Sequence, residues 1–180
     1  MRIIAGKYNR RIIKTIPGLN TRPVTDRIKE SIFNMIVHRY SLDEKLVLDL
    51  FAGSGSFGLE ALSRGAKEVT FVEKANESSA IIKENIQALG CGKECKVQNT
   101  EVESYLKRCS AKFDFIFCDP PFKLENILDI PKLILETNVL SDDGILVFRS
   151  CFKIDFAAYG YSVLHDKVIG RSYIYFLRKK

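Results

Sequence analysis

The feature that most constrains the fold is a regular alternation, from residue 46 onward, of short apolar segments with longer amphipathic ones. The apolar segments have the length of buried strands, and the amphipathic ones repeat their apolar residues at helical spacing. Strands and helices that alternate in this way form a doubly wound, mostly parallel α/β sheet. We predict strands near residues 46–50, 68–72, 95–98, 113–118 and 144–149, and helices near residues 56–64, 77–89, 101–108 and 125–137.

The end of the chain adds two β-rich runs at residues 161–167 and 172–177, separated by Gly170-Arg171. Runs joined by so short a turn can pair antiparallel at the edge of the sheet. We therefore expect a mostly parallel, seven-stranded sheet with an antiparallel C-terminal strand. Pro131 should kink or split the last predicted helix, because proline removes a helical hydrogen bond.

The segment before residue 46 has a different pattern. Residues 2–5 and 10–14 are β-rich and surround a turn, which predicts a hairpin or an extended arm. Thr25 can cap a helix, because the apolar residues that follow it recur at helical spacing. These apolar residues are Ile28, Ile32, Met35 and Ile36.

Positive charge is concentrated at the start of the chain. The net charge is +6, and the first 29 residues contribute eight basic side chains and one acid, a net charge of +7. Such a field suits a partner that carries phosphates, since each contact releases condensed counterions. A solvated, charged hairpin is the alternative. The candidate contacts are Arg2, Lys7, Arg10, Arg11, Lys14 and Arg27.

Length and composition narrow the class of protein. A chain of 180 residues usually forms one domain, within which we separate a basic arm (1–24) from the α/β part (25–180). The sequence contains neither a membrane-length apolar run nor a secretion signal, and its five cysteines lack the spacing of a zinc site. We expect a cytoplasmic monomer with reduced cysteines and no metal, in which Cys118 is a packing residue.

A glycine loop follows the first predicted strand. The strand at 46–50 runs directly into Phe51-Ala52-Gly53-Ser54-Gly55, and a helix follows, the context in which a glycine motif binds a cofactor. Gly58 completes the pattern G-x-G-x-x-G. Glu73, 20 residues after the first of these glycines and at the tip of the next strand, can accept hydrogen bonds from ribose hydroxyls. This pattern suits either a dinucleotide or another adenosine-containing cofactor.

Asp49 distinguishes between these cofactors. It lies inside the strand just before the loop, where a carboxylate would repel a pyrophosphate but would suit a cofactor that carries an amino group and a sulfonium. A dehydrogenase would also need a substrate domain, for which this chain has little room. We therefore predict S-adenosylmethionine rather than NAD.

A second motif, Asp119-Pro120-Pro121-Phe122, ends the strand predicted at 113–118. An exocyclic base amine is a poor nucleophile because its lone pair is delocalised into the ring. Accepting its protons at the Asp119 carboxylate and a proline carbonyl would localise that pair toward a methyl donor. Phe122 can stack on a base drawn out of its helix. The alternative is an ordinary turn after a strand, but both motifs fall where open α/β sheets bind ligands, so we predict that these four residues are catalytic.

These residues resemble the RsmD-type family of bacterial small-subunit ribosomal RNA guanine-N2 methyltransferases. The similarity covers nearly the whole chain. It is carried by Arg2–Gly6, Arg22–Asn34, Asp49–Gly65, Asp119–Phe122 and Gly170-Arg171. The resemblance implies a Rossmann-like class I S-adenosylmethionine-dependent methyltransferase that acts on 16S ribosomal RNA, within an assembly intermediate or the small subunit. It also implies that the basic arm binds this RNA.

The resemblance further implies roles for individual residues. The first three below would approach the methionine end of the cofactor, the glycine loop would wrap it, Glu73 would hold the ribose, and Glu101 with Val102 would meet the adenine. A shorter Asp or Asn is usual at Glu101, and an acidic residue is expected at Arg149. The candidate cofactor-binding residues are Arg22, Pro23, Thr25, Asp49, Phe51, Ala52, Gly53, Ser54, Gly55, Glu73, Glu101, Val102 and Asp119.

Two other functions fit parts of the pattern. Adenine N6 in DNA or RNA could be the methyl acceptor, since the geometry that holds an amine is the same. A non-catalytic RNA-binding module would need only the basic arm and the fold. The joint presence of Asp49, Glu73 and Asp119 argues against this module.

Overall fold

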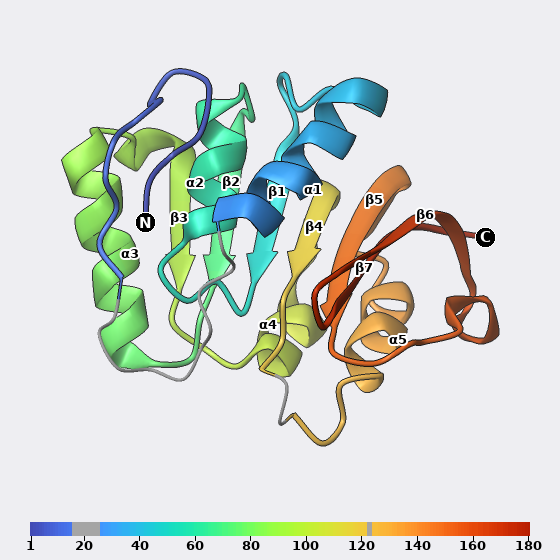
Figure 1. Cartoon of the computed structure of the whole chain (residues 1–180). Coiled ribbons are helices and arrows are strands. Elements are labelled where there is room, and N and C mark those ends of the chain that lie inside the picture. Colours follow the sequence, from blue (N-terminus) through green and yellow to red (C-terminus); the bar gives the residue numbers. More distant parts are fainter. Residues whose placement is uncertain (16–25, 122–123) are drawn as a thin grey trace.

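The computed structural model describes residues 1–15, 26–121 and 124–180, and within them seven strands form one sheet in the order β3-β2-β1-β4-β5-β7-β6. All pairs are parallel except those of β7, which runs antiparallel to β5 and β6. Figure 1 shows the parallel strands pointing in one direction. The strands are β1 (Leu46–Leu50), β2 (Glu68–Val72), β3 (Cys95–Gln98), β4 (Phe113–Cys118), β5 (Leu140–Ser150), β6 (Tyr161–Ile169) and β7 (Ser172–Lys179).

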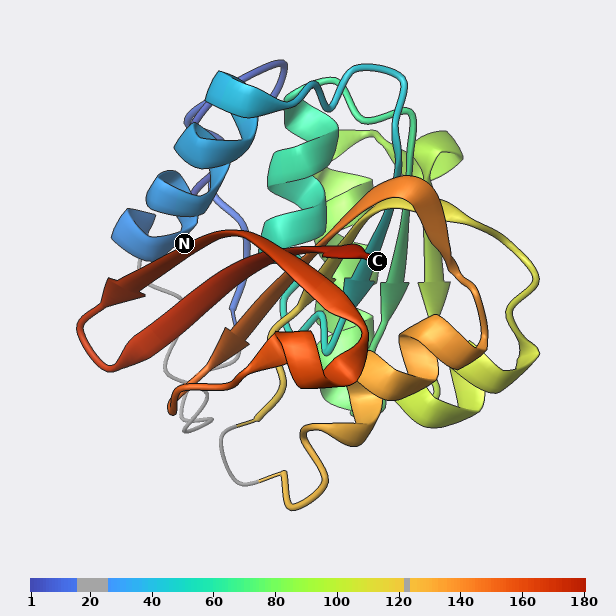
Figure 2. The ribbon, with the colours of Figure 1, turned by 90° about the vertical axis from the view of Figure 1, so that its right-hand side faces the viewer.

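Helices cover both faces of this sheet. The α-helices are α1 (Asp26–Arg39), α2 (Ser56–Ser63), α3 (Asn76–Leu89), α4 (Val102–Arg108) and α5 (Asp129–Glu136), and two short 3-10 helices are η1 (Gly92–Glu94) and η2 (Phe156–Tyr159). Side chains alternate along β4: Phe115 and Phe117 belong to a core with α1, α2 and α3, whereas Ile116 and Cys118 belong to a core with α4 and α5. Figure 2 shows α1 and α5 on opposite sides of the sheet. The predicted α/β fold is confirmed.

Two details differ from the predicted elements. The helix expected at residues 125–137 begins only at Asp129, so Pro131 does not kink it. Pro131 instead lies in the first turn, where its missing N–H would have no helical partner. The fifth strand is longer than expected because β5 begins at Leu140 and contains an irregularity in its pairing with β4. No helix among the described residues has the length and hydropathy needed to cross a membrane.

The N-terminal segment forms the expected hairpin. Ile3 donates its N–H to the carbonyl of Arg11 (3.0 Å), and Arg10 donates back to Ile3 (2.9 Å). Ile3 and Ile13 are buried in the core shared with α1 and α2. At the turn, Gly6 has a φ of +83°, and a Cβ there would lie 1.8 Å from the Ser63 carbonyl oxygen. Only glycine fits this close approach to α2.

A buried ion pair fixes this hairpin to α2. The carboxylate of Glu60 accepts the N–H groups of Ile4 (2.8 Å) and Ala5 (3.1 Å), and Lys29 Nζ lies 3.4 Å from it. Both charged side chains are fully buried, and Arg64 bonds the same carboxylate at 2.7 Å. One of the eight basic residues near the N-terminus, Lys29, is therefore part of the core and is not exposed on the surface of the hairpin.

Candidate active site

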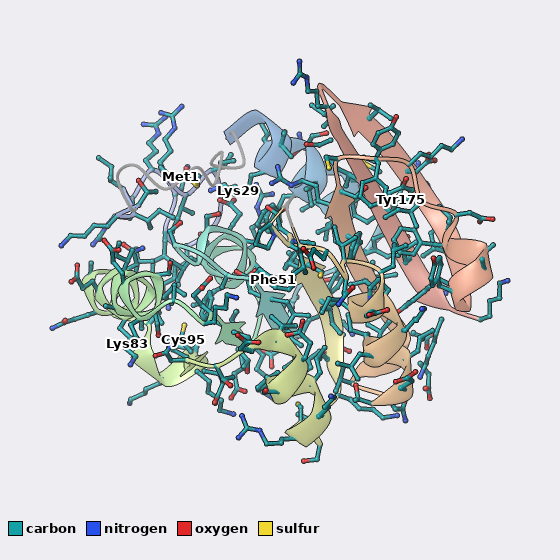
Figure 3. All side chains as sticks on the ribbon, turned by 90° about the horizontal axis from the view of Figure 1, so that it is seen from below. Met1, Lys29, Phe51, Lys83, Cys95 and Tyr175 are labelled. Carbon is teal, nitrogen blue, oxygen red and sulfur yellow. The ribbon has the colours of Figure 1, made fainter. Side chains whose placement is uncertain are left out.

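Four strand ends meet at one edge of the sheet. Leu50 of β1 is in register with Val72 of β2 and with Cys118 of β4, which in turn is in register with Phe148 of β5. The residues that directly follow these four in-register residues therefore lie side by side at this edge. Figure 3 views the molecule from this end and shows Phe51 near its centre. The residues brought together in this way include Phe51, Glu73, Asp119 and Arg149.

The glycine loop turns the chain sharply from β1 into α2. Phe51, Gly53 and Gly55 all have positive φ values, of 57°, 57° and 79°. A left-handed phenylalanine is strained, and strain of this kind is found where a site holds its backbone in place. Gly58 lies against β2, because a Cβ there would meet the Phe71 ring at 2.3 Å. The loop is thus packed closely over the ends of β1 and β2.

Two carboxylates hold this loop in place. Asp49 is buried beneath it, and its Oδ2 accepts the N–H of Gly58 at 2.9 Å. Glu73 accepts the N–H of Gly53 at 2.9 Å through Oε2 and that of Ala75 at 2.8 Å through Oε1. Burial raises the pKa of Asp49 well above its usual value; the Gly58 N–H opposes this shift, and the charges of nearby acids add to it.

A cavity of about 60 Å³ opens beside the loop. Three of the predicted cofactor residues, Phe51, Glu101 and Val102, lie on its wall. Glu101 directly precedes α4 and is exposed, with Lys74 Nζ 3.7 Å from its Oε1. Four further residues of the wall were not predicted from the sequence: Val72, Lys74, Glu103 and Leu124. Of these, Val72 and Lys74 flank Glu73 at the end of β2, a position that could have drawn attention to them.

Asn85 is a further residue that the sequence did not reveal. This buried side chain of α3 donates through Nδ2 to the carbonyls of Ser54 (3.0 Å) and Lys14 (3.1 Å). Its Oδ1 accepts the N–H of Lys14 at 2.7 Å. Asn85 therefore connects the glycine loop to the N-terminal hairpin.

Asp119 lies at the end of β4 and pairs with an arginine. Arg149 Nε lies 2.5 Å from Asp119 Oδ1, and the two side chains are only 10% and 18% exposed. Burial raises the pKa of Asp119, and the charge and hydrogen bond of Arg149 oppose this shift. Cys118 is buried beside it, and burial raises the pKa of its thiol well above the usual value. A thiol in this environment is a packing residue and not a nucleophile.

The rest of the Asp-Pro-Pro-Phe motif is described in part. Pro120 is buried and Pro121 is exposed, with the Pro121 carbonyl accepting the N–H of Leu124 at 2.9 Å. Several predicted site residues lie outside the described residues, as does the side chain of Arg27. These residues are Arg22, Pro23, Thr25 and Phe122.

The predicted basic contacts are exposed on the hairpin. Arg2, Lys7 and Arg10 lie on its surface. Arg11 donates through Nη2 to the Ala88 carbonyl at 2.7 Å, and Lys14 pairs with Glu84 at 2.8 Å, so both also contact α3. The hairpin thus presents cations to solvent while its apolar side enters the core.

The sheet order, the lone antiparallel β7 among the described strands and the glycine loop after β1 define the Rossmann-like fold of class I methyltransferases. The family described as conserved hypothetical protein 95 matches residues 1–178. The chain belongs to this family, that of the ribosomal RNA small subunit methyltransferase D proteins.

Individual relatives agree with this assignment. Ribosomal RNA small subunit methyltransferase D of Haemophilus influenzae is 38% identical over 149 residues, which are 81% of this chain and 76% of that protein. The protein of the same name from Escherichia coli K12 is 31% identical over 150 residues, which are 83% of this chain and 74% of that protein. A solved Escherichia coli structure has a TM-score of 0.88 at 30% identity and covers 100% of this chain and 98% of its own.

Proposed function

We propose that this protein transfers a methyl group from S-adenosylmethionine to the exocyclic N2 amine of a guanine in 16S ribosomal RNA. Membership of a family with named ribosomal RNA methyltransferases supports methyl transfer to ribosomal RNA. The observation that supports an amine as the methyl acceptor is the Asp119 carboxylate. It directly follows β4 beside the glycine loop, and one of its two oxygens accepts a hydrogen bond from Arg149. A carboxylate is an acceptor, and an amine offers donors.

The cavity and loop fit this cofactor. The cavity wall combines apolar side chains, Phe51, Val72 and Val102, with the acids Glu101 and Glu103, which suits a flat adenine with an exocyclic amine. Glu73 at the adjacent strand end would accept the ribose hydroxyls, and Asp49 would attract the amino group through the loop that it supports. We assign the loop residues Ala52, Gly53, Ser54 and Gly55 to the same cofactor, together with Arg22, Pro23 and Thr25.

The protein's own groups would prepare the base amine. Asp119 would accept an N2 proton by hydrogen bonding and keep the nitrogen lone pair localised, while the Pro120-Pro121 backbone would fix the base edge and Phe122 would stack on its face. When bound, S-adenosylmethionine supplies an electrophilic methyl group: an N–C bond forms as the S–C bond breaks, and its electron pair stays on sulfur. The proton that N2 then loses would pass to Asp119 and on to water.

The N-terminal hairpin would bind the RNA. Its exposed cations lie on residues 1–24, which we assign as the RNA-binding arm. We assign residues 25–180 as the methyltransferase domain. A base in a small-subunit assembly intermediate can be held away from its helix, which would make its amine accessible. We propose that the protein acts on such a particle as a monomer.

Asp119→Ala tests this proposal. The substitution removes the acceptor for the amine without touching the cavity wall. We expect methyl transfer to small ribosomal subunits from cells that lack the gene to fall at least ~100-fold, the usual range for a positioned acid–base group. The affinity for S-adenosylmethionine, measured by calorimetry, should change little. Wild-type turnover in the variant would contradict the assignment of Asp119.

A further inference from the structure

We propose that Arg149 is a positioning residue that determines which base is methylated. It keeps the Asp119 carboxylate ionised, so that both of its oxygens are acceptors, and two acceptors match the Watson–Crick edge of guanine but not that of adenine. This inference rests on the proposed function and adds a residue to it. Neither the strand pattern nor the resemblance gave Arg149 a role.

The position of Arg149 follows from the strand register. Cys118 of β4 is paired with Phe148 of β5, so the next residues, Asp119 and Arg149, emerge side by side at the carboxyl edge of the sheet. Arg149 Nε donates to Asp119 Oδ1, and no side chain or N–H in the described part of the chain donates to the second oxygen, Oδ2, which can accept from another donor. The contact therefore orients the carboxylate and still leaves acceptor capacity on it.

The surroundings make this contact important for protonation. Arg149 and Asp119 line a small recess with the apolar side chains Ile32, Phe57, Phe117 and Val147. In such surroundings a carboxyl group is favoured in its neutral form, and burial does raise the pKa of Asp119.

Among the described residues, the titratable groups that interact with Asp119 come from three strands. Asp49 from β1 and the Cys118 thiol from β4 are close enough for their pKa values to be raised by the Asp119 charge. Arg149 from β5 lowers the pKa of Asp119 through its charge and its hydrogen bond. From the described side chains of α1 and α2, Ile32 and Phe57 face the recess, and neither carries a charge. Arg149 thus acts against the effect of burial on Asp119.

The protonation state decides which base edge fits. On its Watson–Crick edge, guanine presents two adjacent donors, N1–H and N2–H, whereas adenine presents a donor at N6 beside an acceptor at N1. An ionised carboxylate has acceptors only and matches guanine. A protonated carboxyl has one donor and one acceptor, and it matches adenine. By keeping Asp119 ionised, Arg149 favours guanine.

The test compares Arg149→Gln, Arg149→Lys and the wild type. The rate of methyl transfer to small subunits from cells lacking the gene is measured from pH 5 to pH 9. Because activity requires ionised Asp119, the rate falls as pH drops through its pKa. We expect Arg149→Gln to move this acidic limb upward by ~1–3 pH units, the usual effect of a neighbouring opposite charge. Arg149→Lys, which keeps the charge, should move it less.

Controls separate this inference from folding and from the proposed function. Arg39→Gln removes an exposed guanidinium at the far end of α1 and should leave the profile unchanged. S-adenosylmethionine affinity, measured by calorimetry, reports whether each variant folds. If Arg149→Gln does not bind the cofactor, the comparison rests on Arg149→Lys, whose acidic limb should still lie above that of the wild type.

Two outcomes would overturn the account at different levels. An acidic limb that coincides in the wild type and in the folded variants would overturn the role of Arg149 while the methyltransferase assignment stood. A wild-type protein that transfers no methyl group to these subunits would overturn the proposed function itself.

Discussion

At the scale of single residues, the site depends on carboxylates whose surroundings differ. Glu73 is held by two backbone N–H groups at the surface of the loop, whereas Asp49 is buried with one. Asp119 is buried beside a cation. Burial opposes the ionisation of both Asp49 and Asp119, and Arg149 opposes this effect at Asp119. The proposed function requires both carboxylates to carry a charge, although burial disfavours that charge in the folded protein.

Asp49→Asn tests how much the buried charge of Asp49 destabilises the folded protein. Because the pKa of Asp49 is raised in the folded state, the folded protein binds more protons than the unfolded one, and its stability falls as pH rises above the unfolded value of about 4. Asparagine can still accept the Gly58 N–H without a charge. We expect Asp49→Asn to melt at a higher temperature than the wild type at pH 8, with a smaller difference at pH 4.

The same substitution should weaken cofactor binding. Losing a charge-assisted contact with the cofactor's amino group is expected to reduce S-adenosylmethionine affinity ~10- to 100-fold. Differential scanning calorimetry and titration calorimetry measure the two effects separately. A variant that is less stable at pH 8 would contradict the burial argument, and unchanged affinity would contradict the cofactor role.

At the scale of elements, α3 connects the two functional segments. Its Asn85 bonds the hairpin at Lys14 and the glycine loop at Ser54. The hairpin and the loop therefore share one buried amide, and RNA contact at the hairpin is physically linked to the shape of the cofactor loop.

Asn85→Ala should disrupt this link. The substitution leaves one N–H and two carbonyls, all only partly buried, without their partner, so we expect the free energy of unfolding to fall by ~1–3 kcal/mol in urea titrations. S-adenosylmethionine affinity should also fall, since the loop loses its support. Gln87→Ala, an exposed change on the same helix, should stay within ~0.5 kcal/mol of the wild type. Equal effects of the two substitutions would show that Asn85 makes no special contribution.

At the scale of the whole molecule, one core carries both the cationic hairpin and the catalytic edge. The hairpin carries exposed cations, and its buried side is fixed to α2 by Glu60 and Lys29. The catalytic edge lies at the carboxyl ends of β1, β2, β4 and β5. RNA held by the hairpin would be positioned by the same core that positions the strand ends.

Salt dependence tests the role of the hairpin. We expect the double substitution Lys7→Gln and Arg10→Gln to weaken RNA binding and to reduce the slope of log K against log salt by ~0.7 for each lost phosphate contact. Binding to 16S ribosomal RNA can be followed by fluorescence anisotropy. Lys132→Gln, an exposed change on α5 across the sheet, is the matched control. An unchanged slope in the double variant would place the RNA elsewhere.

The sequence predicted the strands, the helices and the glycine loop because apolar periodicity and turn residues are local signals. It did not predict the partner of Asp119. That contact depends on the register between β4 and β5, and the irregularity between Phe113 and Phe115 prevents the register from being counted from strand starts. The bonds of Asn85 were hidden for another reason: they join backbone groups far apart in the chain, which carry no side-chain signature.

The most direct test of the central claim is mass spectrometry of 16S ribosomal RNA from cells that lack the gene. We predict that one guanosine loses a single methyl group at N2, that the wild-type gene restores it, and that the gene with Asp119→Ala does not. An RNA with unchanged methylation, or one that loses a methyl group from an adenosine, would contradict the account.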